Sequence, residues 1–172
     1  VLVRGSGHSQ GRFQADVPGV IPDTLRRLVK ASEGFHRVVI RHPTVTAVPY
    51  RCPAGFWTIG WGTLCQADHA PISEDEANAI LETALVSYVG HALRLSPVLS
   101  ITSVGKLVAV ADFVYNLGPT RYAASRFRRA VNAQNWPQAA LECQRWVWAG
   151  GRQLRGLVAR RNAEAALLLT GR

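Results

Sequence analysis

The part of the chain that decides the fold is a stretch rich in aromatic residues and glycine. It reads Tyr50-Arg51-Cys52-Pro53-Ala54-Gly55-Phe56-Trp57-Thr58-Ile59-Gly60-Trp61-Gly62. A Pro-Ala-Gly turn lies between segments of alternating apolar and small polar residues, a pattern typical of a β-hairpin. A helix-like segment that ends at Glu33 precedes it. We therefore expect the hairpin to hold Cys52 and Thr58 in a fixed relation to Glu33.

Composition indicates one basic domain. The chain has 172 residues, and its 48% hydrophobic content is enough for a core. Its net charge of +9 attracts polyanions such as nucleic acid, anionic lipid or acidic cell-wall polymer, and charge alone does not choose among them. The three cysteines, Cys52, Cys65 and Cys143, are too few for a disulfide framework and lack metal-site spacing. We expect no metal and no cofactor.

The N-terminal region predicts a tail rather than a folded element. Residues 1–20 carry scattered glycine and proline without a sustained period. We find neither a signal-peptide pattern nor an apolar run long enough to cross a membrane. Because the chain lacks methionine and begins at Val1, we expect an altered N-terminus from which a targeting segment could have been lost.

A short helix and a small β region follow the tail. The helix is expected to begin at Pro22-Asp23-Thr24, where Asp23 or Thr24 can cap it, and to end at Glu33 before Gly34. Residues 35–64 are rich in Val, Ile, Thr and aromatic residues and contain several prolines. They predict short strands and turns.

The second half of the chain predicts a helical lobe. Ser73 and Glu76 form a capping-box pattern that opens an amphipathic helix through about Leu93. Further helices are expected near residues 103–117, 123–133, 137–148 and 155–169. The predicted fold class is therefore α+β, mainly α. Residues 21–172 form one domain, with a small β lobe at about 35–64 packed beside a larger helical lobe at about 73–170.

Glu33 is the first candidate for chemistry. At a helix C-terminus, the helix dipole disfavours a carboxylate, and nearby apolar groups such as Phe35 act in the same direction. A glutamic acid that keeps its proton near neutral pH can serve as a general acid, as cleavage of a glycosidic bond requires. The alternative is that Glu33 is an exposed residue at a helix end.

Several ordered motifs carry a family resemblance. They are Ser32-Glu33-Gly34, the stretch 50–62, Asp112-Phe113-Val114-Tyr115-Asn116-Leu117-Gly118, Arg145-Trp146, Ala149-Gly150-Gly151 and Gly156-Leu157-Val158-Ala159-Arg160-Arg161-Asn162-Ala163-Glu164. In content and order they resemble the phage-type lysozymes, the endolysins of glycoside hydrolase family 24. The resemblance covers the chain from about residue 22 to its end. It implies a lysozyme-like fold with an active-site cleft between the β-hairpin lobe and the helical lobe.

The resemblance also implies catalytic roles. Glu33 matches the catalytic acid, Thr58 the active-site threonine, and Cys52 the second catalytic position, which is Asp in many members and Cys in others. Cys52 can act as a base for water or attack the sugar as a nucleophile, so inversion and retention both stay open. Without the motif, Cys52 would be a small buried hydrophobe and Thr58 an ordinary strand residue.

Aromatic and amide side chains are the candidates for sugar binding. The predicted substrate-binding residues are Trp57, Trp61, Tyr115 and Asn116. For Trp146 and Trp148 we expect core packing, because large aromatic residues dominate cores. Arg160 and Arg161 either pair with Glu33 across the cleft or face an acidic wall polymer.

Two departures from the family concern the site. The segment 36–49 contains an insertion of about ten residues, which could extend the groove or partly cover it, and Thr63 stands where the family often has His. The cysteines add a further alternative that the resemblance suggests: a disulfide from Cys52 to Cys65 or Cys143 would cage the catalytic thiol. The other alternative is three reduced thiols.

These observations predict a muramidase. It would cleave the β-1,4 bond between N-acetylmuramic acid and N-acetylglucosamine of peptidoglycan and lyse bacteria as a monomer. It would act in the periplasm after synthesis in the host cytoplasm, by an unknown export route. Its basic residues could also bind an anionic outer-membrane surface, and no specific nucleic-acid partner is expected. The alternatives are lytic transglycosylase-like cleavage with Glu33 alone, and a non-catalytic basic module that binds wall or membrane.

Overall fold

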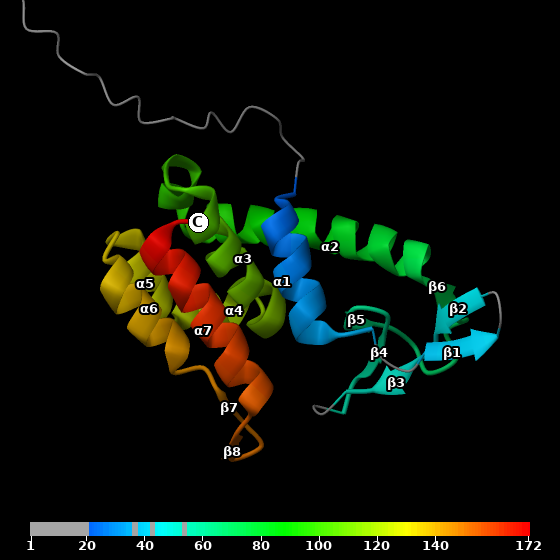
Figure 1. Ribbon diagram of the computed structural model, residues 1–172. Helices are drawn as coiled ribbons and strands as arrows, with labels where there is room; N and C mark the ends of the chain where they lie inside the picture. The colour runs from blue at the N-terminus through cyan, green and yellow to red at the C-terminus, as the bar shows by residue number, and fades with distance from the viewer. Residues whose placement is uncertain (1–20, 36–37, 42–43, 53–54) are drawn as a thin grey trace, which may run out of the picture.

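The long helix α2 (Glu74–Leu95) connects a β-rich end of the molecule to a helical end (Figure 1). The computed structural model describes residues 21–35, 38–41, 44–52 and 55–172. The predicted capping box opens α2: the Ser73 hydroxyl accepts from the Glu76 N–H at 3.1 Å, and the Glu76 carboxylate accepts from the Ser73 N–H at 2.7 Å. The helix therefore begins where the sequence predicted and continues to Leu95.

Helix α1 (Asp23–Glu33) lies between the two ends and packs against the helical lobe through its fully buried Leu25 and Val29. It ends at Glu33 as predicted, and Gly34 turns the chain away with a φ of 68° and a ψ of 156°. The predicted side-chain cap is wrong. The N-cap is Pro22, and no side chain caps the helix, because Asp23 is already helical and pairs with Arg26.

The β lobe consists of two small antiparallel sheets. One joins β1 (Val38–Arg41), β2 (Thr44–Ala47) and β6 (Ile72–Ser73), and the other joins β3 (Tyr50–Arg51), β4 (Trp57–Ile59) and β5 (Thr63–Leu64). In the second sheet Thr58 lies opposite both Tyr50 and Leu64. The predicted hairpin is thus formed by β3 and β4, and its Pro53-Ala54 turn lies outside the described residues. The described part of the inserted segment forms the β1–β2 hairpin at the far end of this lobe (Figure 1).

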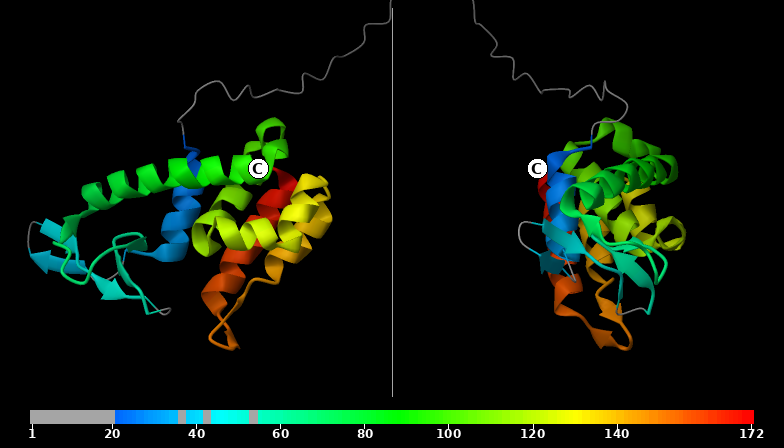
Figure 2. Two further views of the ribbon diagram at one scale, coloured as in Figure 1. Left: turned by 180° about the vertical axis from the view of Figure 1, so that it is seen from behind. Right: turned by 90° about the vertical axis from the view of Figure 1, so that its right-hand side faces the viewer.

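The helical lobe surrounds α3. Its elements are η1 (Pro97–Ile101), α3 (Val104–Leu117), α4 (Pro119–Ala124), α5 (Arg126–Asn132), α6 (Trp136–Gln144) and α7 (Arg155–Thr170). Residues 108–114 of α3 are all buried, and the other helices pack around it (Figure 2). The helix predicted at 123–133 corresponds to α5 but begins too early, because residues 123–124 are the end of α4 and Ser125 caps α5 by accepting from the Arg128 N–H at 3.0 Å. Among the described helices, none is both long and apolar enough to span a bilayer.

The predicted helix 137–148 is wrong at its C-terminal end. Helix α6 stops at Gln144, and β7 (Trp148–Ala149) and β8 (Arg152–Gln153) form a hairpin instead. Gly150 and Gly151 turn the chain between them with φ values of 58° and 75°, which side-chain-bearing residues rarely adopt. Trp148 is 65% exposed in this hairpin, so its predicted core packing is also wrong. Trp146 does pack on the core, edge to face with Phe113 at 5.6 Å.

Candidate active site

A cleft of about 920 Å³ lies between the β lobe and the helical lobe. Helix α1, the β3–β4–β5 sheet, α3 and the start of α7 all contribute to its walls. The lining residues are Ser32, Glu33, Tyr50, Cys52, Thr58, Gly62, Leu64, Asn116, Leu154, Gly156, Leu157 and Arg160. The three residues predicted to be catalytic therefore line one cleft.

The Glu33 carboxylate is held between Arg160 and the hairpin. Its Oε1 accepts a hydrogen bond from Arg160 Nη1 at 2.6 Å, and the side chain is 22% exposed. On the other side, a Cβ at Gly62 would lie 2.9 Å from Oε2. Gly62 also has a φ of +85°, so both space and backbone conformation favour glycine there. Glu33 therefore occupies a defined position at the cleft wall.

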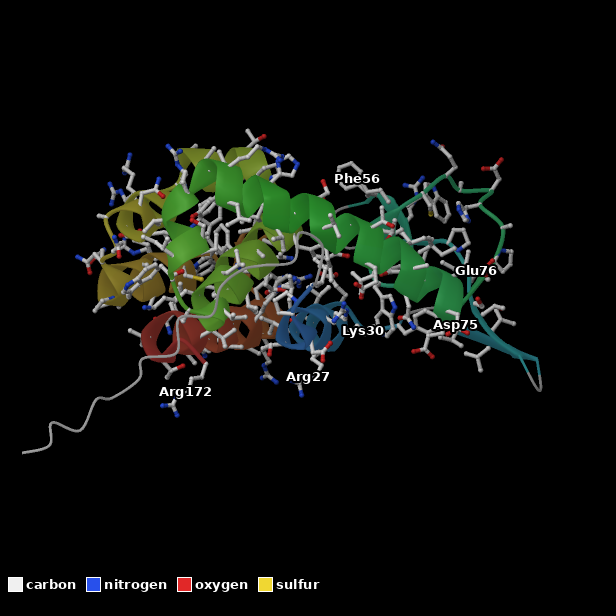
Figure 3. The ribbon with its side chains drawn as sticks, turned by 90° about the horizontal axis from the view of Figure 1, so that it is seen from above. Arg27, Lys30, Phe56, Asp75, Glu76 and Arg172 are labelled. Carbon is white, nitrogen blue, oxygen red and sulfur yellow. The ribbon has the colours of Figure 1, made fainter. Side chains whose placement is uncertain are left out.

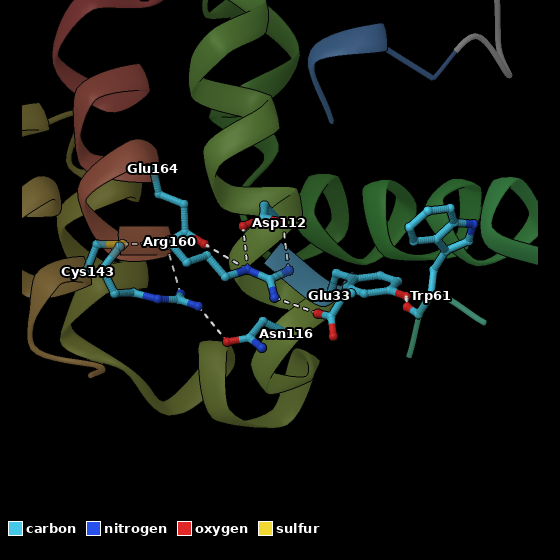
Figure 4. A network of polar contacts seen from close by, with 9 residues as sticks. Glu33, Trp61, Asp112, Asn116, Cys143, Arg160 and Glu164 are labelled. Atoms are coloured by element: carbon cyan, nitrogen blue, oxygen red, sulfur yellow. Dashed lines mark hydrogen bonds and ion pairs between the residues drawn. The ribbon is translucent and has the colours of Figure 1, made fainter. Parts of the chain in front are cut away.

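Arg160 connects Glu33 to the core of the helical lobe. Its Nε and Nη2 donate to the two carboxylate oxygens of Asp112, both at 2.8 Å (Figure 4). The side chains of Arg160 and Asp112 are 3% and 0% exposed. Burial acts to lower the pKa of Arg160, but the charges of Asp112 and Glu33 raise it overall, so the guanidinium stays charged. Of the alternatives for Arg160, pairing with Glu33 is the one observed.

Arg161 does not reach Glu33, and it organises a second buried network instead. Its Nη1 lies 2.9 Å from Glu164 Oε2, and its Nη2 donates to Asn116 Oδ1 at 2.5 Å (Figure 4). The Cys143 thiol donates to the same Glu164 oxygen at 2.9 Å. Burial raises the pKa of Glu164, and burial together with Glu164 raises the pKa of Cys143, so this thiol keeps its proton. Because Arg160 and Arg161 are buried, neither faces a wall polymer.

The hairpin presents Cys52 and Thr58 to the cleft. The Cys52 N–H donates to the Phe56 carbonyl at 2.9 Å, which fixes the backbone of the catalytic candidate. Thr58 is buried, and its hydroxyl donates to the Tyr50 carbonyl at 3.3 Å. All three cysteines are free thiols in this structure, which corresponds to the reduced alternative. Burial raises the pKa of Cys65.

Trp61 and Tyr115 join the hairpin to the helices. The Trp61 side chain is 8% exposed, and its indole N–H donates to Asn78 of α2 at 2.9 Å. The Tyr115 hydroxyl, which comes from α3, donates to the Trp61 carbonyl at 2.8 Å. Neither residue is among those that line the cleft. Their contacts support the hairpin, and a direct contact of either residue with sugar stays a prediction.

The other two candidates for sugar binding differ in position. Asn116 lines the cleft, whereas Trp57 is not among the lining residues and carries the Arg51 guanidinium over its ring at 5.3 Å. A sugar contact by Trp57 stays a prediction. The sequence did not single out Leu154 and Leu157, which line the cleft at the start of α7. Among the described residues, no group of three or more His, Cys, Asp or Glu side chains could hold a metal ion.

A helix-end carboxylate in a cleft between a small β lobe and a helical lobe defines a glycosidase of the lysozyme type. The sequence profile of the phage lysozyme family matches residues 41–164, and the chain belongs to this family. Its members are glycoside hydrolases of peptidoglycan. The family and fold class predicted from the sequence are therefore confirmed.

Individual relatives agree with this assignment. The chain is 32% identical over 146 residues to the endolysin of Bacillus phage B103, covering 84% of this chain but 52% of that protein. It is 27% identical over 169 residues to the SAR-endolysin of Enterobacteria phage PA-2, and this match covers 88% of this chain and 99% of that protein. The chain thus spans about half the length of the first relative and nearly all of the second. Among solved structures, the muramidase domain of SpmX from Asticaccaulis excentricus is similar to this chain, with a TM-score of 0.70 and 25% sequence identity. The similarity covers 88% of this chain and 98% of that domain.

Proposed function

We propose that this chain hydrolyses the β-1,4 bond between N-acetylmuramic acid and N-acetylglucosamine in peptidoglycan, with Glu33 as the general acid. The observation that carries the proposal is the Glu33 carboxylate, anchored by Arg160 at the wall of a cleft that Cys52 and Thr58 also line. Cleavage of a glycosidic bond requires a proton on a poor leaving-group oxygen. Glu33 supplies it.

The anchoring contact assigns different tasks to the two carboxyl oxygens of Glu33. Oε1 accepts from Arg160, so the proton for the leaving group resides on Oε2.

Cys52 and Thr58 act on the attacking side. The Thr58 hydroxyl already donates to the Tyr50 carbonyl, which leaves its oxygen lone pairs free to accept a hydrogen bond from water or sugar. Cys52 assists the attacking water or captures the sugar as a nucleophile. The anomeric configuration of the first product, observed by NMR, distinguishes these two routes.

The decisive experiment measures release of soluble fragments from purified peptidoglycan by wild type, Glu33→Gln and Glu74→Gln. Gln keeps the shape of Glu33 and its contact with Arg160 but supplies no acidic proton, so we expect a loss of about 10²- to 10⁴-fold. Glu74 is exposed at the start of α2, and its substitution should leave the rate unchanged. Equal rates of release by wild type and Glu33→Gln would refute the muramidase mechanism with Glu33 as its acid, and no release by either protein would leave a non-catalytic binding module.

Mass spectrometry of the same digests tests the reaction type. Hydrolysis adds one water to each cleaved bond and yields reducing ends, whereas transglycosylation yields anhydro-sugars without added water. Anhydro products, together with full activity of Cys52→Ser, would mean that Glu33 works alone as acid and then base. We expect reducing ends and an impaired Cys52→Ser.

We infer further that the basic surface brings the enzyme to anionic polymers of the wall or the outer membrane, and that it works there as a monomer in the periplasm. The net charge of +9 supports the attraction to anionic polymers, and Arg27 and Arg172 are exposed on one edge of the molecule (Figure 3). Binding to anionic vesicles should weaken as salt screens these charges. Salt-independent binding would contradict the electrostatic attraction, and light scattering gives the oligomeric state.

A further inference from the structure

The amide of Asn116 has its oxygen occupied inside the protein. Asn116 lies on α3 at the cleft wall, and its Oδ1 accepts from Arg161 Nη2 at 2.5 Å. Figure 4 shows the amide nitrogen of Asn116 on the side of the group opposite the dashed contact to its oxygen. Within the described part of the chain, no acceptor is bonded to this nitrogen.

The chemistry of guanidinium fixes this orientation. A guanidinium has N–H donors only, so the amide must direct its oxygen toward Arg161 and its NH₂ group elsewhere. Arg161 itself cannot turn. It is fully buried, pairs with Glu164 at 2.9 Å, and lies 4.8 Å from the Phe113 ring centroid. Asn116 therefore presents hydrogen-bond donors to the cleft.

We propose that Asn116 selects N-acetylated sugars by donating its Nδ2 hydrogens to the carbonyl oxygen of an acetamido group, and that Arg161 is the positioning residue that holds the amide in this orientation. The inference rests on the proposed hydrolysis of an N-acetylated glycan. A sugar whose acetyl group has been removed carries an ammonium group at neutral pH. The ammonium group of that sugar and the amide NH₂ group of Asn116 are then two donors that face each other. Such a polar mismatch makes the site discriminate strongly against the deacetylated sugar.

The buried network behind Arg161 explains why the orientation is rigid. Glu164 Oε2 takes both the Arg161 ion pair and the Cys143 thiol hydrogen bond at 2.9 Å. The Arg161 fork thus contacts Glu164 with one nitrogen and Asn116 with the other. A lysine has one ammonium group and cannot reproduce this fork.

The test compares two forms of purified, uncrosslinked glycan strands: intact strands and strands chemically stripped of their N-acetyl groups. The readout is the ratio of the initial hydrolysis rates on the two forms, since a merely structural defect lowers both rates alike. The main variant is Asn116→Asp, which is isosteric and still accepts from Arg161 but offers an acceptor to the cleft. Asn162→Asp is the matched control, because it adds the same charge at an exposed position on α7.

We expect wild type to prefer intact strands and Asn116→Asp to lower that preference at least about tenfold, because a carboxylate suits an ammonium and repels a carbonyl. Asn162→Asp should match wild type. An unchanged ratio in Asn116→Asp would overturn the proposal while the muramidase assignment stands. If the wild-type protein does not hydrolyse intact strands, the proposed function is refuted instead.

Arg161→Lys tests the positioning role separately. Without the fork the amide can rotate and offer either its oxygen or its nitrogen, so the preference for intact strands should fall, by a smaller factor than in Asn116→Asp. A wild-type ratio in Arg161→Lys would remove Arg161 from the mechanism. If this variant does not fold, Asn116→Asp alone still decides whether the acetamido group is recognised.

Discussion

The buried ion pair between Asp112 and Arg160 makes Asp112→Asn a sharp test of how the cleft is held together. Asp112 receives two hydrogen bonds of 2.8 Å from Arg160, and the two side chains are 0% and 3% exposed. Asn can accept one of these bonds, but its NH₂ group then faces a guanidinium N–H. Because the variant removes the fully buried partner of the Arg160 guanidinium and leaves it with Glu33, which is partly exposed, we expect a loss of about 3–5 kcal/mol in the free energy of unfolding. For a chain of this size, the melting temperature should fall by about 6–20 °C.

The assay is denaturation followed by circular dichroism at neutral pH, with Asp23→Asn as the control. Asp23 also pairs with an arginine, Arg26, but its side chain is 85% exposed, so its loss should cost at most about 1 kcal/mol. Below its transition temperature, Asp112→Asn should also lose activity, because Arg160 no longer holds Glu33 at a fixed position. Equal small losses of stability in both variants would refute the view that Asp112 anchors the site.

Three further predictions test particular contacts. Gly62→Ala should abolish most activity and lower the free energy of unfolding by about 1–2 kcal/mol, because the added Cβ would lie 2.9 Å from Glu33 Oε2 on a residue with a φ of +85°. A variant that hydrolyses peptidoglycan at the wild-type rate would contradict this prediction. Gly105→Ala places a Cβ 2.6 Å from the Gly171 backbone. It should lower the free energy of unfolding by about 1–3 kcal/mol without changing the hydrolysis rate at low temperature. An unaltered melting temperature would contradict this prediction. Burial raises the pKa of Glu164. The contribution of Glu164 to stability is therefore complete below the ordinary glutamate pKa and is lost as pH rises toward the folded-state pKa, by at most about 1.4 kcal/mol per pH unit. Glu164→Gln should remove this pH dependence of stability, and parallel curves of stability against pH for the two proteins would contradict the prediction.

Local sequence patterns predicted the elements that local interactions determine. The capping box at Ser73 and the helix end at Glu33 depend on residues within one turn, and both are found at the predicted positions. The break at Ser125 and the β7–β8 hairpin were missed. Both interrupt segments whose apolar content suits a helix, and a serine cap or a pair of glycines decides the outcome. A glycine pair is a turn signal in its own right, and it could have shortened the predicted helix.

The polar framework of the site was less accessible to prediction. Arg160 lies 127 residues from Glu33 and 48 from Asp112 in the chain, so no periodicity connects them. The available signal was indirect: an acid within the apolar segment of α3, and two adjacent arginines in a late helix. Charged residues on buried helix faces are found paired, which indicates that partners exist but not which ones. The sequence could therefore offer Arg160 as a partner of Glu33 only as one alternative.

The geometry around Arg160 also explains how Glu33 is positioned. Arg160 gives two hydrogen bonds to Asp112 and a single one, at 2.6 Å, to Glu33. Asp112 thus fixes the guanidinium in the core, and the remaining nitrogen of that guanidinium fixes Glu33 at the cleft wall. A general acid must lie within hydrogen-bond reach of the atom that it protonates, so an acid held by a buried arginine meets the geometric requirement of the proposed reaction.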